Sequence, residues 1–494
     1  MQTVSCPSCG AEVKFRSHAS VMAVCEYCNT RVLKEAGAVR DLGKISSVLE
    51  DYSPIQIGSS GSLAGRAFTV VGRIQLRYSA GMWNEWYLQF DDASTGWLGD
   101  ASGQYTATSL RPPSPNPPAF DELRPGRQYN IDGERFTAAD IRTAECIGGQ
   151  GELPFKVGDG WQAKVADFRR GAAFVTLDYS DEGAPLVYSG VPVTLEQMQM
   201  QLLRDEDQIR QSAGHYRGKL DKLDCPSCGS AIQYLPGMTA NLVCQSCHAQ
   251  LDASSPKVEV LAAGESVEAQ RFTLEPGATG KLGSQEFTVL GAMRRADDEG
   301  TVWTEYLLYG PRAGFTWLVE TDEGWSRANV LDEWPEWSGG PATLNKIEFE
   351  KLYEYESTVR YAAGAFNWRV SVGDRTRVAE FRRQQISLAA ELTAEEMTWS
   401  RSTPIAFDQL KSWFGNSVRG SAPPRTAQGD TMAARAGRYK RTAKGFVTAL
   451  LMLNAVPLFA TLGESGFGSQ LAYSALGAIA IYLPAIFLDS VDKS

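Results

Sequence analysis

Short runs of apolar and β-branched residues, separated by Gly, Asp and Pro, are the main pattern along the chain. Such runs, rich in Val, Trp, Tyr, Phe and Thr, are typical of β-strands joined by turns. The runs of the first half are 68–72, 83–88, 97–98 and 165–170. Their counterparts of similar sequence in the second half are 287–291, 303–308, 317–318 and 378–383. The pattern therefore predicts a duplicated unit that is mostly β.

Helical spacing follows each set of predicted strands. Residues 194–219 carry apolar side chains at roughly helical intervals from Leu195 to Ile209, with Glu196 close to a capping position. The corresponding stretch of the second unit begins at Thr393. We therefore expect each β-rich unit to end in a helix.

The C-terminal end of the chain differs from all that precedes it. Residues 445–462 and 466–488 carry no charge, and each stretch is near the roughly 20 residues that a helix needs to cross a bilayer. The short connection at 463–465 predicts a transmembrane helical hairpin. A re-entrant or interfacial element is the alternative for the first stretch, which contains Pro457, and a pair of buried core helices is the alternative for both.

Charge around the two uncharged stretches predicts their orientation. Five basic residues precede the first stretch, whereas the connection between the two stretches has no Lys or Arg. By the positive-inside rule, the bulk of the chain is then cytoplasmic. The five residues are Arg435, Arg438, Lys440, Arg441 and Lys444.

Eight of the nine cysteines form two copies of one motif, and both copies open with Cys-Pro-Ser-Cys-Gly. A CxxC pair directs two thiolates at one point, so two pairs complete a tetrahedral zinc shell. We therefore predict two zinc ribbons, each with a structural Zn²⁺. The ligands are Cys6, Cys9, Cys25 and Cys28 in the first ribbon, and Cys225, Cys228, Cys244 and Cys247 in the second.

Disulfides are the alternative for these cysteines, and they need an oxidising compartment. The first residues contain no basic segment followed by an apolar one, so we expect no signal peptide. The predicted cytoplasmic location is reducing, which favours metal-bound thiolates. The ninth cysteine, Cys146, is expected to be buried and inert.

These patterns together predict a mostly β protein of the α+β class. It contains two units, each a zinc ribbon followed by a β-rich domain, and a C-terminal transmembrane hairpin. The expected segments are a first ribbon (1–40), a β-rich domain with a trailing helix (50–219), a second ribbon (220–256), a second β-rich domain (265–414), a flexible basic linker (415–444) and two transmembrane helices (445–488).

Charge narrows the range of partners. The net charge is -10 and the pI about 5.1, which argues against a general binder of polyanions. Residues 1–40 hold five basic and three acidic side chains, whereas residues 221–256 hold only Lys222 against three acidic ones. Phosphate binding needs several bases on one surface, so nucleic acid is not expected as a partner. A nucleic-acid-binding zinc-ribbon protein stays an alternative.

The order of the repeated motifs resembles the bacterial domain of unknown function 4178 (DUF4178). The motifs are Phe-Thr-Val-x-Gly, Trp-x-Glu-aromatic, Trp-Leu, and Val-Gly-Asp followed by Asp/Glu-Phe, and they occur in this order within 50–200 and within 265–400. The resemblance implies no assigned enzymatic activity and carries over no catalytic residue. It also implies gene neighbours that are polyamine-synthase-like enzymes and small membrane proteins, and hence an envelope-associated system.

One repeated motif carries candidate ligand-binding chemistry. Alternate residues of a strand share a face, so Trp83 stands beside Glu85, and Trp303 beside Glu305. An aromatic ring beside a carboxylate suits an organic cation, such as a polyamine, through charge and cation–π attraction. The alternative is that the tryptophans fill a core while each glutamate lies at its rim or pairs with an arginine.

No catalytic site is expected. The chain has no phosphate loop with Gly-Lys-Ser/Thr and no HExxH motif, and a shell of four cysteines leaves no position for a substrate. We therefore expect a non-enzymatic scaffold or interaction protein, anchored in a bacterial inner membrane and facing the cytoplasm, with protein partners. A small-cation (polyamine-like) binding or sensing module is the alternative function.

Overall fold

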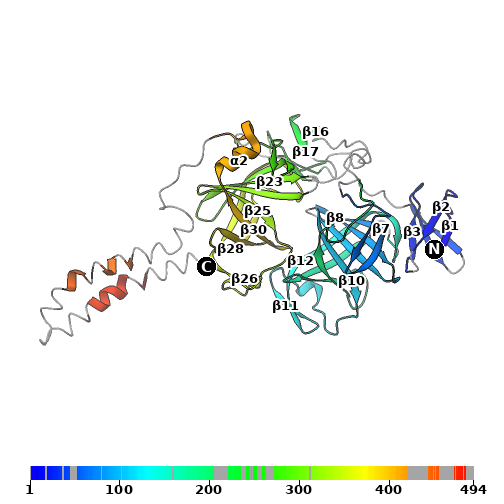
Figure 1. The fold of residues 1–494 in the computed structure, drawn as a ribbon, viewed down its shortest axis with the longest axis horizontal. Coiled ribbons are helices and arrows are strands. Elements are labelled where there is room, and N and C mark those ends of the chain that lie inside the picture. Colours follow the sequence, from blue (N-terminus) through cyan, green and yellow to red (C-terminus); the bar gives the residue numbers. More distant parts are fainter. Residues whose placement is uncertain are drawn as a thin grey trace.

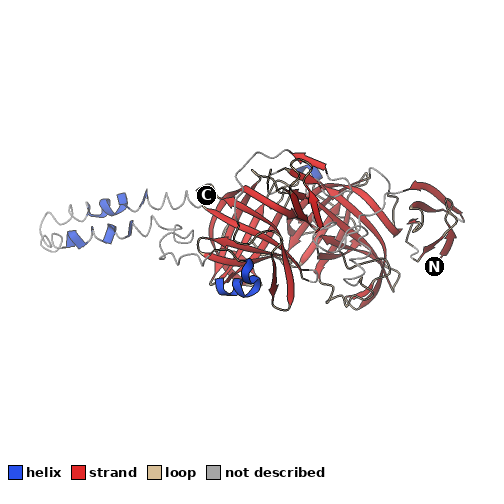
Figure 2. Cartoon of the chain, turned by 90° about the horizontal axis from the view of Figure 1, so that it is seen from above, coloured by secondary structure: helices blue, strands red, loops and turns tan. Residues whose placement is uncertain are grey.

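Antiparallel strands dominate the structure, a computed structural model (Figures 1 and 2). The residues that it describes are 2–16, 19–35, 38–44, 53–78, 81–101, 103–157, 161–204, 221–234, 241–244, 246–247, 249–252, 259–262, 272–310, 313–420, 443–444, 446–448, 450, 452–455, 472, 474–481 and 483–484.

In the described part of the first unit, eight strands form a closed, barrel-like antiparallel sheet. In order around this first closed sheet they are β7 (Arg66–Tyr78), β8 (Gly81–Phe90), β9 (Thr95–Ala101), β10 (Gln104–Arg111), β15 (Leu186–Val193), β14 (Ala173–Asp178), β13 (Gln162–Arg170) and β12 (Glu134–Leu153). Strand β12 closes the ring, because it pairs with β13 over 137–145 and with β7 over 145–151.

The second unit repeats this order. Its closed sheet runs through β22 (Gln285–Ala296), β23 (Val302–Gly310), β24 (Gly314–Thr321), β25 (Gly324–Val330), β30 (Met397–Ile405), β29 (Ile386–Leu392), β28 (Arg375–Arg383) and β27 (Ile347–Phe366), and β27 pairs back with β22. All the strand runs predicted from the sequence lie within strands of the two sheets. The predicted duplication and the mostly β fold class are therefore confirmed.

Glycines permit the close approach at each closure. A Cβ at Gly72, on β7, would lie 1.8 Å from the carbonyl oxygen of Glu152 on β12. In the second unit Gly364 has a φ of 96°, and a Cβ there would lie 2.4 Å from the carbonyl oxygen of Leu290. Only glycine adopts such a backbone so close to another strand without strain.

The cysteine-bearing segments continue the long strands of the closed sheets. Strand β3 (Met22–Val24) pairs with the end of β12, and β18 (Asn241–Val243) pairs with the end of β27. The other strands of these segments are β1 (Gln2–Ser5), β2 (Glu12–Phe15), β4 (Thr30–Glu35), β5 (Ala38–Lys44), β16 (Asp221–Asp224), β17 (Ala231–Tyr234), β19 (Gln250–Asp252) and β20 (Glu259–Ala262). Short elements beside the closed sheets are β6 (Ser60–Leu63), β11 (Gln128–Ile131), β21 (Thr279–Leu282), β26 (Ala342–Leu344), η1 (Phe120–Glu122) and η2 (Gly415–Ser417).

The prediction of a helix from residue 194 is wrong for 194–204, the part that the structure describes. Thr194 and Gln197 do form a reciprocal capping pair, with hydrogen bonds of 2.9 and 3.1 Å. The chain then turns away, because Gln199 and Leu202 adopt positive φ values of 49° and 54°. Residues 205–219 of the expected helix lie outside the described residues.

The helix expected from Thr393 is also wrong, since 393–396 form the turn between β29 and β30. A helix does follow the second sheet, but later: it is α2 (Phe407–Phe414). Leu410 and Phe414 of α2 are buried against the outside of the second closed sheet. The apolar spacing of an amphipathic helix is therefore found after the last strand, in α2, and not in the turn at 393–396.

The predicted membrane hairpin falls largely outside the described residues. The described pieces of 446–455 and 474–484 are helical, and a Cβ on Gly477 would lie 3.1 Å from a methyl carbon of Leu450, so the two stretches are neighbours. Among the residues described, no helix has the length and the apolar character needed to cross a bilayer.

The two units pack against each other, a point that the sequence left open. The backbone N–H of Ile141 donates to the carbonyl of Glu395 at 3.0 Å, and that of Trp334 donates to Gly171 at 3.0 Å. Ala139 of the first unit belongs to an apolar cluster of the second. The interface is therefore built from backbone hydrogen bonds and buried apolar contacts.

Candidate metal centres and ligand cavity

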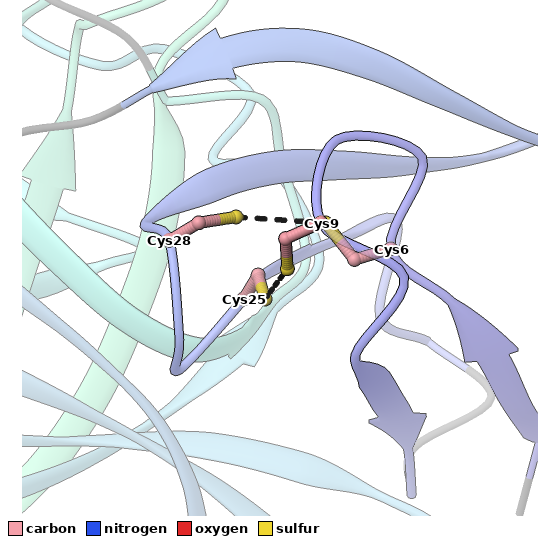
Figure 3. Close-up of side chains that lie close together, drawn as sticks. All are labelled: Cys6, Cys9, Cys25 and Cys28. Atoms are coloured by element: carbon pink, nitrogen blue, oxygen red, sulfur yellow. Dashed lines mark hydrogen bonds between the residues drawn. The ribbon is translucent and has the colours of Figure 1, made fainter.

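The four cysteines of the first group come together in space (Figure 3). The Sγ atoms of Cys6 and Cys28 are 3.7 Å apart, and those of Cys9 and Cys25 are 3.6 Å apart. The turn after the first pair is closed by Gly10, whose φ of 78° lets its N–H donate to the carbonyl of Cys6 at 2.9 Å. This turn directs both thiols of the pair to one point.

The second group repeats this geometry. Its two Sγ–Sγ distances are 3.7 and 3.6 Å, and Gly229, with a φ of 75°, donates to the carbonyl of Cys225 at 2.8 Å. The members of this group are Cys225, Cys228, Cys244 and Cys247. The predicted pairing of knuckles is thus present in both units.

The thiol geometry fits a metal ion. The four Sγ atoms of each group lie within 4.8 Å of one another. A tetrahedron with metal–sulfur bonds of about 2.3 Å has edges of about 3.8 Å, whereas the sulfurs of a disulfide are about 2.05 Å apart. No disulfide joins any of the nine cysteines, and Cys146 is buried in the core of the first closed sheet, as expected. Each group could therefore hold one metal ion in a shell of four protein ligands.

A buried carboxylate fastens the first cysteine-bearing segment to the first closed sheet. Glu152, which is 1% exposed, accepts a hydrogen bond from the backbone N–H of Arg16 at 2.6 Å and another from the hydroxyl of Ser20 at 2.9 Å. No local sequence pattern marks Glu152, because its partners are far away along the chain. The metal group is thus held to the closed sheet by a charge-assisted contact as well as by strand pairing.

The two predicted Trp–Glu pairs are present inside the closed sheets. The indole N–H of Trp83 donates to the Glu85 carboxylate at 2.8 Å, and that of Trp303 donates to Glu305 at 2.7 Å. Each tryptophan therefore meets its glutamate through the edge of the indole. This contact holds the carboxylate in place and leaves its other oxygen for a further partner.

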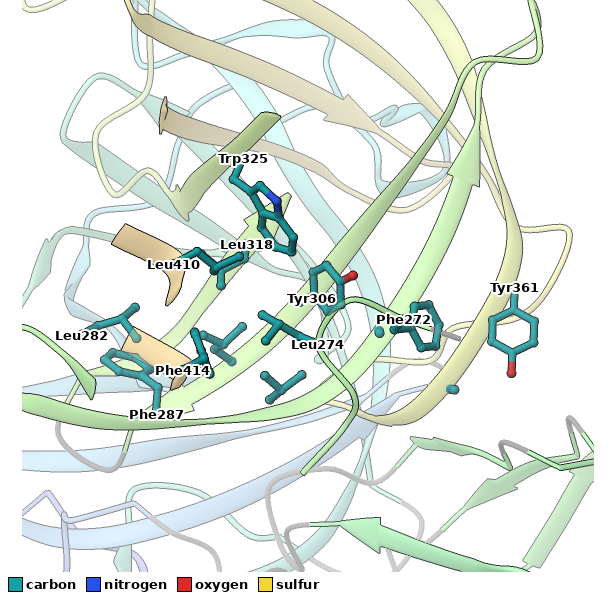
Figure 4. Close-up of a cluster of buried hydrophobic side chains, with 14 residues drawn as sticks. Phe272, Leu274, Leu282, Phe287, Tyr306, Leu318, Trp325, Tyr361, Leu410 and Phe414 are labelled. Atoms are coloured by element: carbon teal, nitrogen blue, oxygen red, sulfur yellow. The ribbon is translucent and has the colours of Figure 1, made fainter. Parts of the chain in front are cut away.

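The opposite face of the same strand packs outward. Tyr306, next to Glu305 in the sequence, belongs to an apolar cluster with Phe272 and Trp325, and Leu410 of α2 packs against this cluster from outside (Figure 4). The rings of Tyr306 and Trp325 are stacked, with centroids 5.4 Å apart. Because side chains alternate along a strand, Glu305 faces the interior.

The inner faces of the sheets line a cavity of about 2210 Å³, to which both units contribute. Polar and aromatic side chains share its walls, as is usual for a ligand site. On the side of the first unit the aromatic residues are Tyr78, Trp83, Trp97, Tyr105, Phe155, Trp161, Phe174 and Tyr188. The carboxylates among the inward-facing residues there are Glu85, Asp140, Asp167 and Asp178.

Three of these carboxylates have counterparts in the second unit. The registers correspond, since Val165 pairs with Asp178 in one sheet and Val378 pairs with Glu391 in the other. The equivalent residues are Glu85 and Glu305, Asp167 and Glu380, and Asp178 and Glu391. The duplication has therefore placed a triad of carboxylates inside each closed sheet.

Burial makes ionisation of the first triad and of the neighbouring Asp140 unfavourable. It raises the pKa of Glu85 to about 8, although the hydrogen bond from Trp83 opposes the shift. It raises the pKa of Asp140 to about 7, against the opposing charge of Arg142. Burial also raises the pKa of Asp167 and Asp178. A group of carboxylates in this state gains from a cation that enters the cavity.

The second closed sheet contains its own cation. Arg295, whose side chain is 6% exposed, places Nη1 3.5 Å from Oε1 of Glu305 and 3.1 Å from Oε2 of Glu391. One guanidinium therefore bridges two carboxylates of this triad. For the second unit, the alternative of a glutamate paired with an arginine describes what the structure contains.

The aspartates of the first triad, Asp167 and Asp178, were not among the predicted site residues. A usable signal was present at Asp167, which stands between Ala166 and Phe168, both 0% exposed. A carboxylate flanked on a strand by two core residues faces the opposite side of the sheet. In a closed sheet that opposite side is the interior.

The comparison with protein families matches the domain of unknown function DUF4178 at residues 56–195 and 275–407, together more than half of the chain. The chain belongs to the DUF4178 family. The two matched regions cover the two closed sheets of this DUF4178 protein, and each cysteine group precedes one of them. Searches of curated proteins and of solved structures returned no match.

Proposed function

We propose that this DUF4178 protein binds a small organic cation inside its first closed sheet. The observation that carries the proposal is the half-buried Glu85, which accepts a hydrogen bond from the indole N–H of Trp83 at 2.8 Å. Among the described residues, no Lys or Arg forms an ion pair with Glu85. A polyamine-like ligand meets the chemistry of this site, because several carboxylates and aromatic rings surround one cavity.

The energetics favour a cation over a neutral ligand. Glu85 has already lost most of its hydration on folding, which is why its pKa is raised to about 8. An ion pair at 4 Å in such a partly desolvated site is worth on the order of 4 kcal/mol, and a cation over an aromatic face adds about 1–2 kcal/mol. The ligand thus replaces the solvation that folding removed.

Calorimetry with spermidine tests the proposal on the full chain in detergent. At pH 8 we expect saturable binding to the wild type and at least about a tenfold loss of affinity for Glu85→Gln, since a tenfold change corresponds to 1.4 kcal/mol. Glu305→Gln is the matched control, because Glu305 is already paired with Arg295 at 3.5 Å. Folded wild-type protein that gives no heat above buffer would refute the proposal.

We assign zinc to both cysteine groups, in a structural role. A shell of four thiolates at these spacings suits Zn²⁺, and its four protein ligands leave no coordination site for substrate water. Zinc would hold together segments that have small cores of their own, through the free energy of metal binding. We accordingly propose a binding protein without catalytic activity.

A scaffold role at a bacterial inner membrane is our second candidate. One surface residue supports it: Tyr27, in the second CxxC pair of the first group, is 80% exposed. Exposed tyrosines are frequent anchors of protein interfaces. The uncharged stretches 445–462 and 466–488, with basic residues before them, support a membrane tether that keeps the closed sheets in the cytoplasm.

Affinity capture from detergent extracts tests the scaffold role. We expect partners of the full chain to be lost when the chain is stopped before Gly445, if the tether brings them together. Tyr27→Ser tests the surface residue, because Ser246 is its counterpart in the second group. Identical partners for all three proteins would exclude both the tether and Tyr27 as determinants.

A further inference from the structure

The interiors of the two closed sheets differ in the residue that pairs with the tryptophan of the Trp–Glu pair. Leu76 of β7 pairs with Trp83, and Arg295 of β22 pairs with Trp303. Because Trp83 and Trp303 are equivalent, Leu76 and Arg295 occupy the same place in the two units. The first unit thus has a buried aliphatic side chain, 3% exposed, where the second has a guanidinium.

Arg295 shows which chemistry the triad accepts. Its Nη1 lies 3.5 Å from Glu305 and 3.1 Å from Glu391, and both carboxylates have acidic equivalents in the first unit, Glu85 and Asp178. In the part of the chain that the structure describes, neither of these two carboxylates forms an ion pair. The first unit therefore retains the carboxylates and lacks the cation that the second provides from its own chain.

The third carboxylate of the triad, Asp167 in the first unit and Glu380 in the second, also has different neighbours in the two units. In the second unit Glu380 accepts hydrogen bonds from two hydroxyl groups, at 3.0 Å from Tyr353 and 2.7 Å from Tyr355. By register, the residues equivalent to these tyrosines are Asp140 and Arg142.

Arg142 does not supply the missing cation, because it has other partners. Its guanidinium binds Asp140 on the same strand and Glu396 of the second unit, and it lies over the ring of Tyr78 at 3.8 Å. The first interior therefore contains a fourth carboxylate. Of its two inward arginines, Arg142 is held at the boundary between the units, and Arg169 lies over the ring of Phe174 at 4.4 Å.

We propose that the ligand inside the first closed sheet is a small alkylguanidine, whose guanidinium bridges Glu85 and Asp178 as Arg295 bridges Glu305 and Glu391. This inference rests on the proposed function and specifies its ligand class. A guanidinium is planar and presents five donors, so one group can serve two carboxylates. An ammonium is a compact, strongly hydrated charge that bridges them less well. The residue at this equivalent place, Leu76 in the first unit and Arg295 in the second, then decides whether a unit binds the ligand.

The first test compares three probes that share a butyl chain: n-butylguanidinium, the smaller n-butylammonium, and the neutral n-butylurea, which has nearly the shape of butylguanidinium. In calorimetry at pH 8 on the full chain, we expect one equivalent of butylguanidinium to bind. Butylammonium should bind at least about tenfold more weakly and butylurea should give no measurable binding. Equal affinity for the first two probes would overturn the guanidinium assignment.

The second test exchanges the residues that distinguish the units. Leu76→Arg should abolish butylguanidinium binding, because the introduced guanidinium reaches the same carboxylates, while the control Leu76→Met keeps one site. Arg295→Met should raise the number of sites from one to two. If Arg295→Met does not fold, Leu76→Arg alone decides: a variant that keeps wild-type affinity would overturn the proposal.

The outcomes also separate this inference from the proposed function. Binding of spermidine without binding of butylguanidinium would refute the ligand class and leave the cation site standing. No binding of either probe to folded, metal-loaded protein would refute both. Butylguanidinium binding that Glu85→Gln leaves unchanged would place the ligand elsewhere and also refute the inference.

Discussion

Arg142 and Glu396 join the two units of the protein. The guanidinium of Arg142 projects from β12 of the first closed sheet, and the carboxylate of Glu396 comes from the turn before β30 of the second. An antiparallel bridge between Asp140 and Glu396 aligns the two backbones at the same point. The contact places a turn of the second unit beside the inner surface of the first.

Loss of this contact should destabilise the protein. Arg142→Met leaves the half-buried Asp140 without its partner, and we expect a loss of about 1–3 kcal/mol in the free energy of unfolding. Urea denaturation followed by tryptophan fluorescence measures it. Glu395→Gln is the control, because the side chain of Glu395 is exposed and its hydrogen bonds to Ile141 and Thr393 are made by its backbone. A loss below about 1 kcal/mol for Arg142→Met would show that the ion pair is solvated.

Stability and cation affinity should both depend on the ionisation of Glu85. Its pKa rises from 4.5 to about 8 on folding, so its contribution to stability is full below pH 4.5 and is lost as the pH rises to 8. A bound cation favours the ionised form, so affinity should increase up to about pH 8 and then level off. The titratable groups that face Glu85 are Asp167, Asp178 and Tyr188. Their charges, and that of Asp100 on the other face of the sheet, act on Glu85 in the same sense.

Thermal unfolding and calorimetry between pH 5 and pH 9 measure both effects. Glu85→Gln should reduce the slope of stability against pH and should remove most of the rise in affinity. A wild-type affinity that falls between pH 6 and pH 8 would contradict the assignment of Glu85 as the titrating group.

Each metal ion should stabilise its own segment. Cys6→Ser should lower the metal content from two equivalents to one and make the first cysteine-bearing segment sensitive to protease, while the second stays resistant. Cys225→Ser should do the reverse. Elemental analysis and limited proteolysis measure this, and Cys146→Ser is the control, because that thiol lies outside both groups. Two equivalents of metal in Cys6→Ser would exclude the first group as a metal site.

Glu152 should couple the first cysteine-bearing segment to the first closed sheet. Glu152→Ala removes the acceptor for the N–H of Arg16 and the hydroxyl of Ser20, and we expect this docking to weaken by about 2–3 kcal/mol. Hydrogen exchange of residues 19–35 should accelerate in the variant. Glu145→Ala, at an exposed position of the same strand, should leave the exchange unchanged. Equal exchange in both variants would mean that strand pairing alone holds the segment.

Part of the candidate site could be predicted because it depends on spacing along one segment. The neighbourhood of Trp83 and Glu85 follows from alternation on a single strand, and the meeting of Cys6 with Cys28 follows from the CxxC spacing. The helix expected from 194 failed for a local reason, since positive φ values at Gln199 and Leu202 end the first turn. The spacing of apolar residues alone does not indicate where the backbone adopts a positive φ.

By itself the sequence determined the duplication, the strand-rich class and the two groups of four cysteines, because each is encoded in spacings of a few residues. Only the tertiary structure decided that Glu85 and Asp178 line one interior, that Arg295 takes the place of Leu76, and that Arg142 reaches Glu396. These relationships depend on the long strands β12 and β27, which close each sheet by pairing with strands distant in the chain. The closure of each sheet decides whether a carboxylate such as Glu85 or Glu305 lies beside an arginine or lines the cavity. No local pattern of residues specifies this.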